Sequence, residues 1–271
     1  MIRLLFALGA VLVALPGFAQ VKEGKVVYER TIQFQMRLQQ VDPAIANNLP
    51  RSRTDRFELK FSPTKVLWEA LPDMDASAEG FGGPGGGGGG PVFMRFGGDD
   101  YVYTDLQTGI SIAKQELASK NYLVTDSVRK LPWKLTDESK TILNYKARKA
   151  VAQRIGTRFV MNMENGEMKR SQEADTTEVT AWFTTEVPVA AGPEFNGQLP
   201  GLKLELEMNR GRTVYKALEV STKVNVANIK EPKGGKPITA ADFAQERNKV
   251  FEEMRRNMPP GQRMNMRVQA N

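Results

Sequence analysis

The residues that could do chemistry in this chain are few, because its 271 amino acids include no histidine and no cysteine. Ser-His-Asp triads, Cys-His dyads, and zinc sites built from thiolates or imidazoles are therefore excluded. Paired carboxylates remain, and they could act in hydrolysis or bind Ca²⁺. The pairs are Glu205/Glu207, Asp73/Asp75 and Asp99/Asp100. We interpret the first pair as solvated charge on the polar face of a strand, and the aspartate spacing matches no known calcium loop.

Methionine is the other residue with metal chemistry, because thioethers bind Cu(I) in an oxidising compartment. The methionines of interest are Met161, Met163 and Met168 near a predicted hairpin, and Met254, Met258, Met264 and Met266 towards the C-terminus. Lysine and arginine side chains among the second group would repel a cation. We therefore interpret all of them as core, gap-filling or tail residues, and we expect no cofactor. A metal-binding protein, with copper on methionines or calcium on aspartates, stays the alternative function, and a carboxylate-based hydrolase is the least favoured.

The first 19 residues have the layout of a secretory signal peptide. Arg3 precedes an apolar run from Leu4 to Leu15, and Gly17-Phe18-Ala19 forms a cleavage site of mostly small residues. The run is too short to span a bilayer, which takes about 20 residues. The sequence therefore predicts an exported protein, periplasmic or secreted, with no transmembrane span after signal cleavage.

Positive charge is in excess, with a formal net charge of +7, and it gathers towards the C-terminus. Residues 258–271 predict a basic, methionine-rich, flexible tail. Because export would separate the protein from cytoplasmic nucleic acid, we expect no nucleic-acid partner. The oligomeric state stays open.

Alternation of apolar and polar residues predicts about ten strands, mostly at hairpin spacing. They cover residues 24–39, 57–61, 66–71, 101–103, 110–113, 122–124, 155–163, 177–185, 202–208, 213–221 and 223–229, with a short strand led by Trp133. Thr239 and Asp242 resemble a capping box and predict a helix that ends at Pro259. The absence of strand–helix alternation argues against a parallel sheet.

These elements predict one mainly β domain over residues 20–257, at the border of α+β. We expect a single large, bent antiparallel sheet or half-barrel with a C-terminal helix, its concave face covered by a helix or by loops. The glycine run within residues 78–98 predicts a flexible low-complexity insertion. A phosphate loop is not supported, because no Gly-Lys-Ser/Thr follows.

One segment concentrates turn residues directly before a strand: VTAWFTTEVPVAAGPEFNGQLPGLKLELE, residues 179–207. Its prolines end strand pairing and its glycines permit tight turns. We interpret it as a rigid loop that aims the strand 202–208, with one of Trp182 and Phe183 in the core. A ligand-binding loop is the alternative, and Glu194 and Asn196 are its only obvious polar groups.

This segment resembles the signature of the GLPGLI family, secreted proteins best known from Bacteroidetes. A second segment, from Trp133 to Ala150, is similar to the family's W-K-(L/I)…E-x-K-x-I…Y-K…K-A pattern. The residues that carry the resemblance, which we interpret as structural, are Trp133, Tyr145, Trp182, Phe183, Pro188, Gly192, Pro193, Gly197, Leu199, Pro200, Gly201 and Leu202.

Three departures from the family pattern stand out. Gln198 is inserted within the hexapeptide, Lys203 replaces its final isoleucine, and Ala147 stands where relatives often carry cysteine. The family has no established activity, so the resemblance implies a secreted β-rich fold and no particular reaction. The sequence favours an exported cell-envelope protein without evident catalysis, whose bent sheet binds an apolar or lipid-like ligand or an outer-membrane partner. Residues that face a cavity, rather than a sealed core, would support the ligand.

Overall fold

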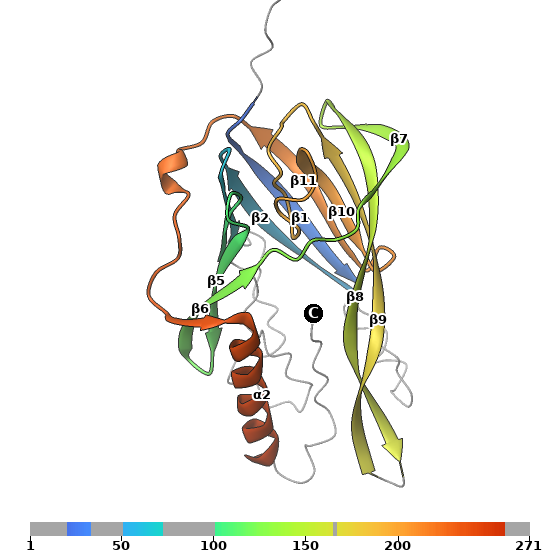
Figure 1. The fold of residues 1–271 in the computed structure, drawn as a ribbon, viewed down its shortest axis with the longest axis vertical. Helices are drawn as coiled ribbons and strands as arrows, with labels where there is room; N and C mark the ends of the chain where they lie inside the picture. Colours follow the sequence, from blue (N-terminus) through green and yellow to red (C-terminus); the bar gives the residue numbers. More distant parts are fainter. Residues whose placement is uncertain (1–20, 34–50, 73–100, 165–166, 258–271) are drawn as a thin grey trace, which may run out of the picture.

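The computed structural model describes residues 21–33, 51–72, 101–164 and 167–257. Within these ranges, twelve strands form one open, curved sheet in the order β12-β6-β5-β4-β3-β2-β1-β11-β10-β9-β8-β7 (Figure 1). The elements are β1 Gly24–Gln33, β2 Ser52–Phe61, β3 Lys65–Ala70, β4 Tyr101–Asp105, β5 Ile110–Leu117, β6 Lys120–Ser127, β7 Lys134–Ile142, β8 Tyr145–Glu164, β9 Glu167–Thr184, β10 Leu202–Met208, β11 Thr213–Ser221, η1 Val226–Asn228, β12 Lys236–Thr239 and α2 Ala240–Asn257. The prediction of a mainly β fold with one large sheet and a C-terminal helix is confirmed.

Two details of the prediction are wrong. The sheet is mixed, because β12 pairs in parallel with β6 while the other strand pairs are antiparallel. The connection that follows β11 carries the chain across to the far edge, where β12 runs in the same direction as β6. The strand predicted over residues 223–229 is instead an irregular stretch with the short turn η1, which the Asn225 side chain caps by accepting from the backbone N–H of Ala227.

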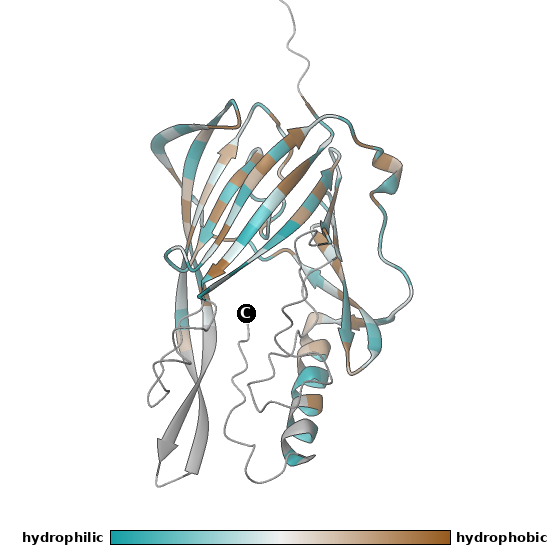
Figure 2. Ribbon diagram, turned by 180° about the vertical axis from the view of Figure 1, so that it is seen from behind, coloured by the Kyte–Doolittle hydropathy of each residue, from teal (hydrophilic) through white to brown (hydrophobic). Residues whose placement is uncertain are grey.

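Hydrophobic and hydrophilic residues alternate along the strands, which Figure 2 shows as bands of colour. The burial pattern of the strands places the apolar side chains on one face of the sheet and charged ones on the other. On the inner face, buried side chains of β1, β2, β3, β9, β10 and β11 form the main core; the largest that are fully buried include Tyr28, Phe57, Phe61 and Phe183. On the outer face, Lys25, Glu58, Lys60 and Glu69 form a row of ion pairs across β1, β2 and β3. Such alternation is expected where a sheet is covered on one side only.

Helix α2 begins at the predicted capping box, where the backbone N–H of Asp242 donates to Thr239 Oγ1 at 3.1 Å. It lies beside β6 and β12 at one end of the sheet (Figure 1), where Phe243 packs edge-on against Tyr122. The helix therefore covers the sheet edge, and the inner face is covered by a loop. No helix in the described ranges has the length and apolarity needed to cross a bilayer.

Candidate functional site

The connection between β9 and β10, residues 185–201, lies against the inner face of the sheet; we call it the motif loop. Val187, Val189, Ala191 and Leu199 are buried in the same cluster as the core strands. The loop folds back on itself, because the N–H of Gly197 donates to Ala190 O at 2.7 Å. It also pairs with the start of β10 through two backbone bonds, from Leu202 N to Val187 O and from Lys203 N to Ala191 O. These contacts hold β10 at the place where it enters the sheet.

Two glycines of the motif loop sit where a side chain has no room. A Cβ on Gly201 would lie 2.0 Å from the carbonyl oxygen of Thr184, which is backbone and cannot yield. A Cβ on Gly192 would lie 2.6 Å from that of Lys203, and Gly192 also has a φ of +140°, a conformation that favours glycine. Beside it Pro193 is buried, whereas Pro188 and Pro200 face solvent.

Gln198, the residue inserted in the hexapeptide, links the two motif segments. Its Oε1 accepts from the indole N–H of Trp133 at 2.9 Å and from the backbone N–H of Leu131 at 2.8 Å, and its Nε2 donates to Arg129 O at 2.8 Å. The Trp133 ring meets Phe195 edge-on, with ring centroids 6.0 Å apart. The amide thus makes three hydrogen bonds that hold the motif loop to the chain leading into β7. No pattern of residues predicts this role for Gln198.

Trp182 and Phe183 lie on opposite faces of β9, and Phe183 is the core residue of the two. Trp182 is half-buried on the outer face, with the Lys140 ammonium 4.3 Å from its ring centroid and that of Lys149 at 5.9 Å. Tyr145, at the start of β8, packs half-buried against the main core. These residues pack against the core or against neighbouring strands of the sheet rather than line an open site.

Lys203 is fully buried, contrary to the alternation of LKLELE, which predicts it on the polar face. A β-bulge between Lys203 and Glu205 changes the register, so that Lys203 lies opposite the core residue Phe183. Its Nζ donates to Phe195 O at 2.8 Å. Burial lowers the pKa of Lys203 from its usual 10.5 to about 7, although the nearby Glu194 carboxylate raises it in part. The ammonium joins β10 to the motif loop from inside.

A polar network closes the other side of the motif loop. The Tyr215 hydroxyl donates to Glu194 Oε1 at 2.7 Å and accepts from Arg30, whose Nη2 donates to Asp55 Oδ2 at 2.9 Å. Burial raises the pKa of Tyr215 well above its usual value, so its hydroxyl stays protonated and remains a donor. Glu194 has a φ of +57°, which is uncommon for a residue other than glycine. The network fastens the loop to β1, β2 and β11, and each carboxylate has a partner.

Of the carboxylate and methionine alternatives, the side chains that the structure describes are those of the Glu205/Glu207 pair. Glu205 pairs with Lys140 at 2.8 Å on the outer face, and 19% of the Glu205 side chain is exposed. No group of three or more acidic side chains that could hold a metal occurs within the described residues. The four aspartates and three of the tail methionines, Asp73, Asp75, Asp99, Asp100, Met258, Met264 and Met266, lie outside those residues.

Strands β8 and β9 continue past the rest of the sheet as a two-stranded ribbon. β7 pairs with β8 over Tyr145–Val151 and β10 pairs with β9 over Val179–Thr184, whereas β8 and β9 pair with each other out to Glu164 and Glu167. Among the described strands, none other pairs with residues 153–164 or 167–178, which we call the ribbon. It projects from the sheet (Figure 1), and Ile155 at its base is 81% exposed.

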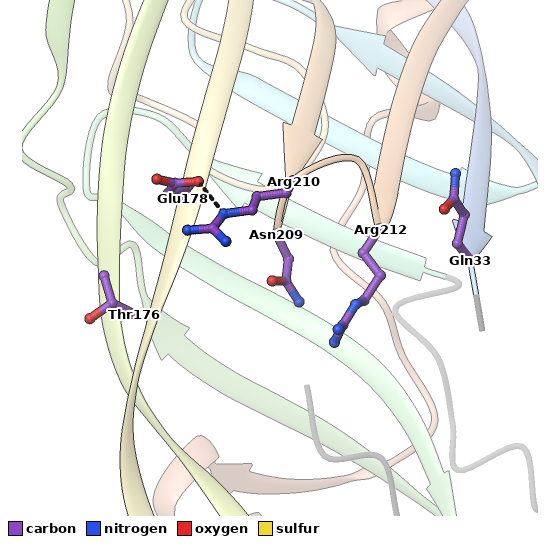
Figure 3. A pocket seen from close by; sticks show the side chains of 6 residues that line it. All are labelled: Gln33, Thr176, Glu178, Asn209, Arg210 and Arg212. Atoms are coloured by element: carbon purple, nitrogen blue, oxygen red, sulfur yellow. Dashed lines mark hydrogen bonds and ion pairs between the residues drawn. The ribbon is translucent and has the colours of Figure 1, made fainter. Parts of the chain in front are cut away.

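A polar depression lies at the base of the ribbon, where β10 ends (Figure 3). It is open to solvent, with a volume of about 330 Å³, and its lining residues are Gln33, Thr176, Glu178, Asn209, Arg210 and Arg212. The Asn209-Arg210-Gly211 turn forms one wall, and all three residues have positive φ. Arg210 Nε donates to Glu178 Oε2 at 3.0 Å, across the gap between the turn and β9. No pattern in the sequence predicts this depression.

Residues 133–205 match a family model described as a protein of unknown function (Porph_ging). The match contains the segment from Trp133 to Ala150 and all but the last two residues of the segment 179–207, so the chain is similar to this family there, while membership of the GLPGLI family stays a prediction. No curated protein matches the chain.

Two solved structures of PNGF-II, in space groups C2 and P21, are similar in fold, with TM-scores of 0.49 and 0.48 and identities of 15% and 14%. Each alignment covers 84% of this chain and about a third, 33% and 34%, of the PNGF-II chain. The chain therefore spans about a third of the length of the structures it matches.

Proposed function

We propose that this chain is an exported, non-catalytic cell-envelope protein that binds a partner protein through the ribbon of β8 and β9. The observation that carries the proposal is the length of the ribbon beyond the strands that flank it. An isolated two-stranded hairpin is at best marginally stable in water. A ribbon of this length is therefore better explained as a docking element than as part of the core.

The exposed side chain of Ile155 supports the same proposal. It is 81% exposed at the point where the ribbon leaves the sheet, the largest exposed fraction among the large hydrophobic residues whose side chains the structure describes. An aliphatic side chain in water loses the free energy that burial would give, about 25 cal/mol for each Å² of apolar surface. Contact with a partner would recover it.

The inner face of the sheet favours a protein partner over a lipid-like ligand. A carrier of the predicted kind would keep its concave face open, but here Val187, Val189 and Leu199 of the motif loop are buried in the core cluster. Ligand pockets are usually concave and mostly apolar, whereas the depression at the ribbon base has a polar lining. We therefore propose a protein partner rather than a lipid-like ligand.

Two features of the sequence support the proposal that the protein is exported. Residues 1–19 have the signal-peptide pattern, and a chain without cysteine has no thiol at risk in an oxidising compartment. In such a compartment the partner is another envelope or secreted protein.

Site-specific photo-crosslinking tests the proposal. A benzophenone amino acid is placed at Ile155, and in a matched control at Ile110, which is 42% exposed on β5. Both variants are produced in a host that exports the chain, irradiated in intact cells and purified under denaturing conditions. We expect one discrete adduct from position 155 and none from position 110, and mass spectrometry then identifies the partner.

Equal adducts at both positions, or none at position 155, would contradict the proposal. An adduct of twice the chain's mass would identify a second copy as the partner. Native mass spectrometry of the same protein provides a check on the competing function, because a reproducible added mass of lipid size would favour a ligand carrier.

A further inference from the structure

We propose that the partner is a second copy of this chain, and that the two ribbons pair antiparallel along their β8 edges, with Phe159 of each copy at the two-fold axis. This inference rests on the proposed function, since it names what the ribbon binds. A second copy shares the proposed export, so it is present in the same compartment.

The outer edge of β8 is open from Gln153 onwards. β7 reaches β8 only as far as the pair of Lys134 and Val151. Before Lys134 the chain crosses the sheet on its way from β6 (Figure 1), and the Gln198 amide of the motif loop holds it there by a hydrogen bond from Trp133. Beyond Val151, β9 is therefore the only described strand that pairs with β8.

Backbone groups along this edge point away from β9. Thr136 Oγ1 of β7 donates to Lys149 O at 3.4 Å, which places the Lys149 carbonyl on the side of β7. Gln153 lies opposite Glu178, whose carbonyl accepts from the N–H of Asn209 and so points away from β8. Residues two apart in a strand direct their N–H and C=O groups to the same side, and opposite residues of an antiparallel pair both face inwards or both outwards. Every second residue from Gln153 onwards therefore offers its N–H and C=O at the open edge, which is a template for strand addition.

The open edge is self-complementary in antiparallel pairing. Two identical strands that pair antiparallel are related by a two-fold axis, so residues at equal distances from the axis lie opposite each other. The stretch from Arg154 to Glu164 has Phe159 at its midpoint. With the axis there, Ile155 lies opposite Met163, and Arg154 lies opposite Glu164. Cross-strand pairs of apolar residues and of opposite charges both stabilise a sheet.

The added strand also fits the length of the space beside β8. Its last residue, Glu164, lies opposite Arg154 of the other copy, whereas β7 of that copy begins opposite Val151. The added strand and β7 therefore occupy consecutive stretches of one edge and do not overlap. Together the two ribbons form four adjacent strands, whereas three or more strands with a hydrophobic face are needed for a sheet to be stable by itself.

The residue types of the two strands favour β8 over β9 as the edge that pairs. Alternation places every second residue of a strand on one face. The residues of β8 that share a face with the exposed Ile155 are Thr157, Phe159, Met161 and Met163. The residues of β9 that lie opposite these five are Thr176, Ala174, Gln172, Arg170 and Met168. Contact between two β8 strands therefore buries mostly apolar residues, which is favourable, whereas contact between two β9 strands would bury mostly polar ones.

Sedimentation velocity of the full exported chain tests the dimer. The contact of one strand edge is smaller than a standard protein interface, so we expect a reversible dimer with a Kd on the order of 10 µM. The measurement is made below and above this concentration.

Proline substitutions test which edge pairs. Thr157→Pro removes an N–H at the β8 edge and should weaken the dimer at least about tenfold. Thr176→Pro removes an N–H at the β9 edge and is the matched control, which should dimerise as the wild type does. Neither substitution removes a hydrogen bond between β8 and β9, and thermal unfolding confirms that both variants are folded.

An exchange of charges tests the register. Arg154→Glu places like charges opposite each other at two sites of the dimer and should raise the Kd about tenfold. Glu164→Arg should have the same effect. The two substitutions in one chain restore opposite charges, so the Kd should return to within about threefold of the wild-type value.

A chain that stays monomeric at every concentration, or equal effects of Thr157→Pro and Thr176→Pro, would overturn the inference. Failure of the double exchange to restore the dimer would overturn the register centred on Phe159. The Ile155 crosslink separates these failures from failure of the proposed function. An adduct of twice the chain's mass supports both proposals. An adduct with a different protein would support the proposed function and overturn the inference, and a chain without an adduct would contradict both.

Discussion

Strand β9 belongs to two regions of the molecule that differ in almost every physical respect. From Val179 to Thr184 it pairs with strands on both sides, and Val179, Ala181 and Phe183 are buried beneath the motif loop. From Glu167 to Glu178 it pairs only with β8 among the described strands. The difference indicates that strands on both sides support β9 in the first region, and we propose that the second region binds the partner.

The contrast extends to the side chains that fasten each region. The motif loop is tied down by the Gln198 amide, by Lys203 Nζ and by the contact between Tyr215 and Glu194. At the base of the ribbon, Arg210 and Glu178 form an exposed ion pair. Substitutions in the first region should therefore change stability, and substitutions in the second should change binding.

The largest effect is expected from glycine. Gly201→Ala places a Cβ against the Thr184 carbonyl, and we expect the free energy of unfolding to fall by at least about 3 kcal/mol. Gly156→Ala in the ribbon meets no atom within 4 Å, and its effect should stay within about 0.5 kcal/mol. Urea denaturation of both variants measures the difference. Similar losses of unfolding free energy in the two variants would contradict the proposed difference between the motif loop and the ribbon.

The next largest effect on the free energy of unfolding is expected from Lys203. Here removal of the side-chain charge should stabilise the protein, whereas Gly201→Ala should destabilise it. The pKa of Lys203 is about 7 in the folded protein and 10.5 when exposed, so the unfolded state binds more protons between these values. Stability should therefore rise with pH from 7 to 10.5, by at most about 1.4 kcal/mol per pH unit. Below pH 7 the ammonium is charged in both states, and the cost of burying it is fully present.

Lys203→Met nearly keeps the length of the side chain and removes the charge of the ammonium group. We expect it to raise the free energy of unfolding at pH 7 by about 1–3 kcal/mol and to flatten the rise above pH 7. Lys216→Met, at an exposed position on β11, is the control and should change neither. A destabilised Lys203→Met protein, or one whose pH dependence is unchanged, would show that the ammonium stabilises the loop.

The clamp made by Gln198 should have a smaller effect. Gln198→Ala leaves the Trp133 indole N–H and the Leu131 N–H without their acceptor, and we expect a loss of about 1–3 kcal/mol. Gln153→Ala, at an exposed site at the ribbon base, should cost less than about 0.5 kcal/mol. Differential scanning calorimetry of the two variants compares them. An equal change in melting temperature would mean that Gln198 is not a clamp.

The features of the fold and the candidate site that could be predicted from the sequence are those that depend on a local pattern of residues. Alternation predicted the large sheet and its apolar face, and the Thr239–Asp242 pair predicted the start of α2, because both are local patterns. The burial of Lys203 could not be predicted, since one bulge residue reverses the alternation. The role of Gln198 could not be predicted either, because its hydrogen-bond partners lie 65 to 69 positions away in the sequence.

The ribbon and its depression were missed for a related reason. Alternation in residues 155–163 and 177–185 predicted strands, but it does not record how far each neighbouring strand extends. The open edge arises only because β10 stops at Met208 while β9 continues, and this is a property of the pairing register. The candidate site therefore depends on three-dimensional register, whereas the motif loop could be recognised as a rigid turn from its glycines and prolines.

The smallest effect on stability, and the most direct test of the division between the two regions, comes from removing the ribbon. Residues 154–177 are replaced by Asn-Gly, which joins the paired residues Gln153 and Glu178 by a two-residue hairpin turn. Thermal unfolding and binding to the partner identified at position 155 are then measured on one preparation. We predict a melting temperature within about 2 °C of the full chain, because the change in unfolding free energy should be well below 1 kcal/mol, together with complete loss of partner binding. A variant that keeps the partner, or one that no longer folds, would contradict the claim that stability and binding reside in separate regions.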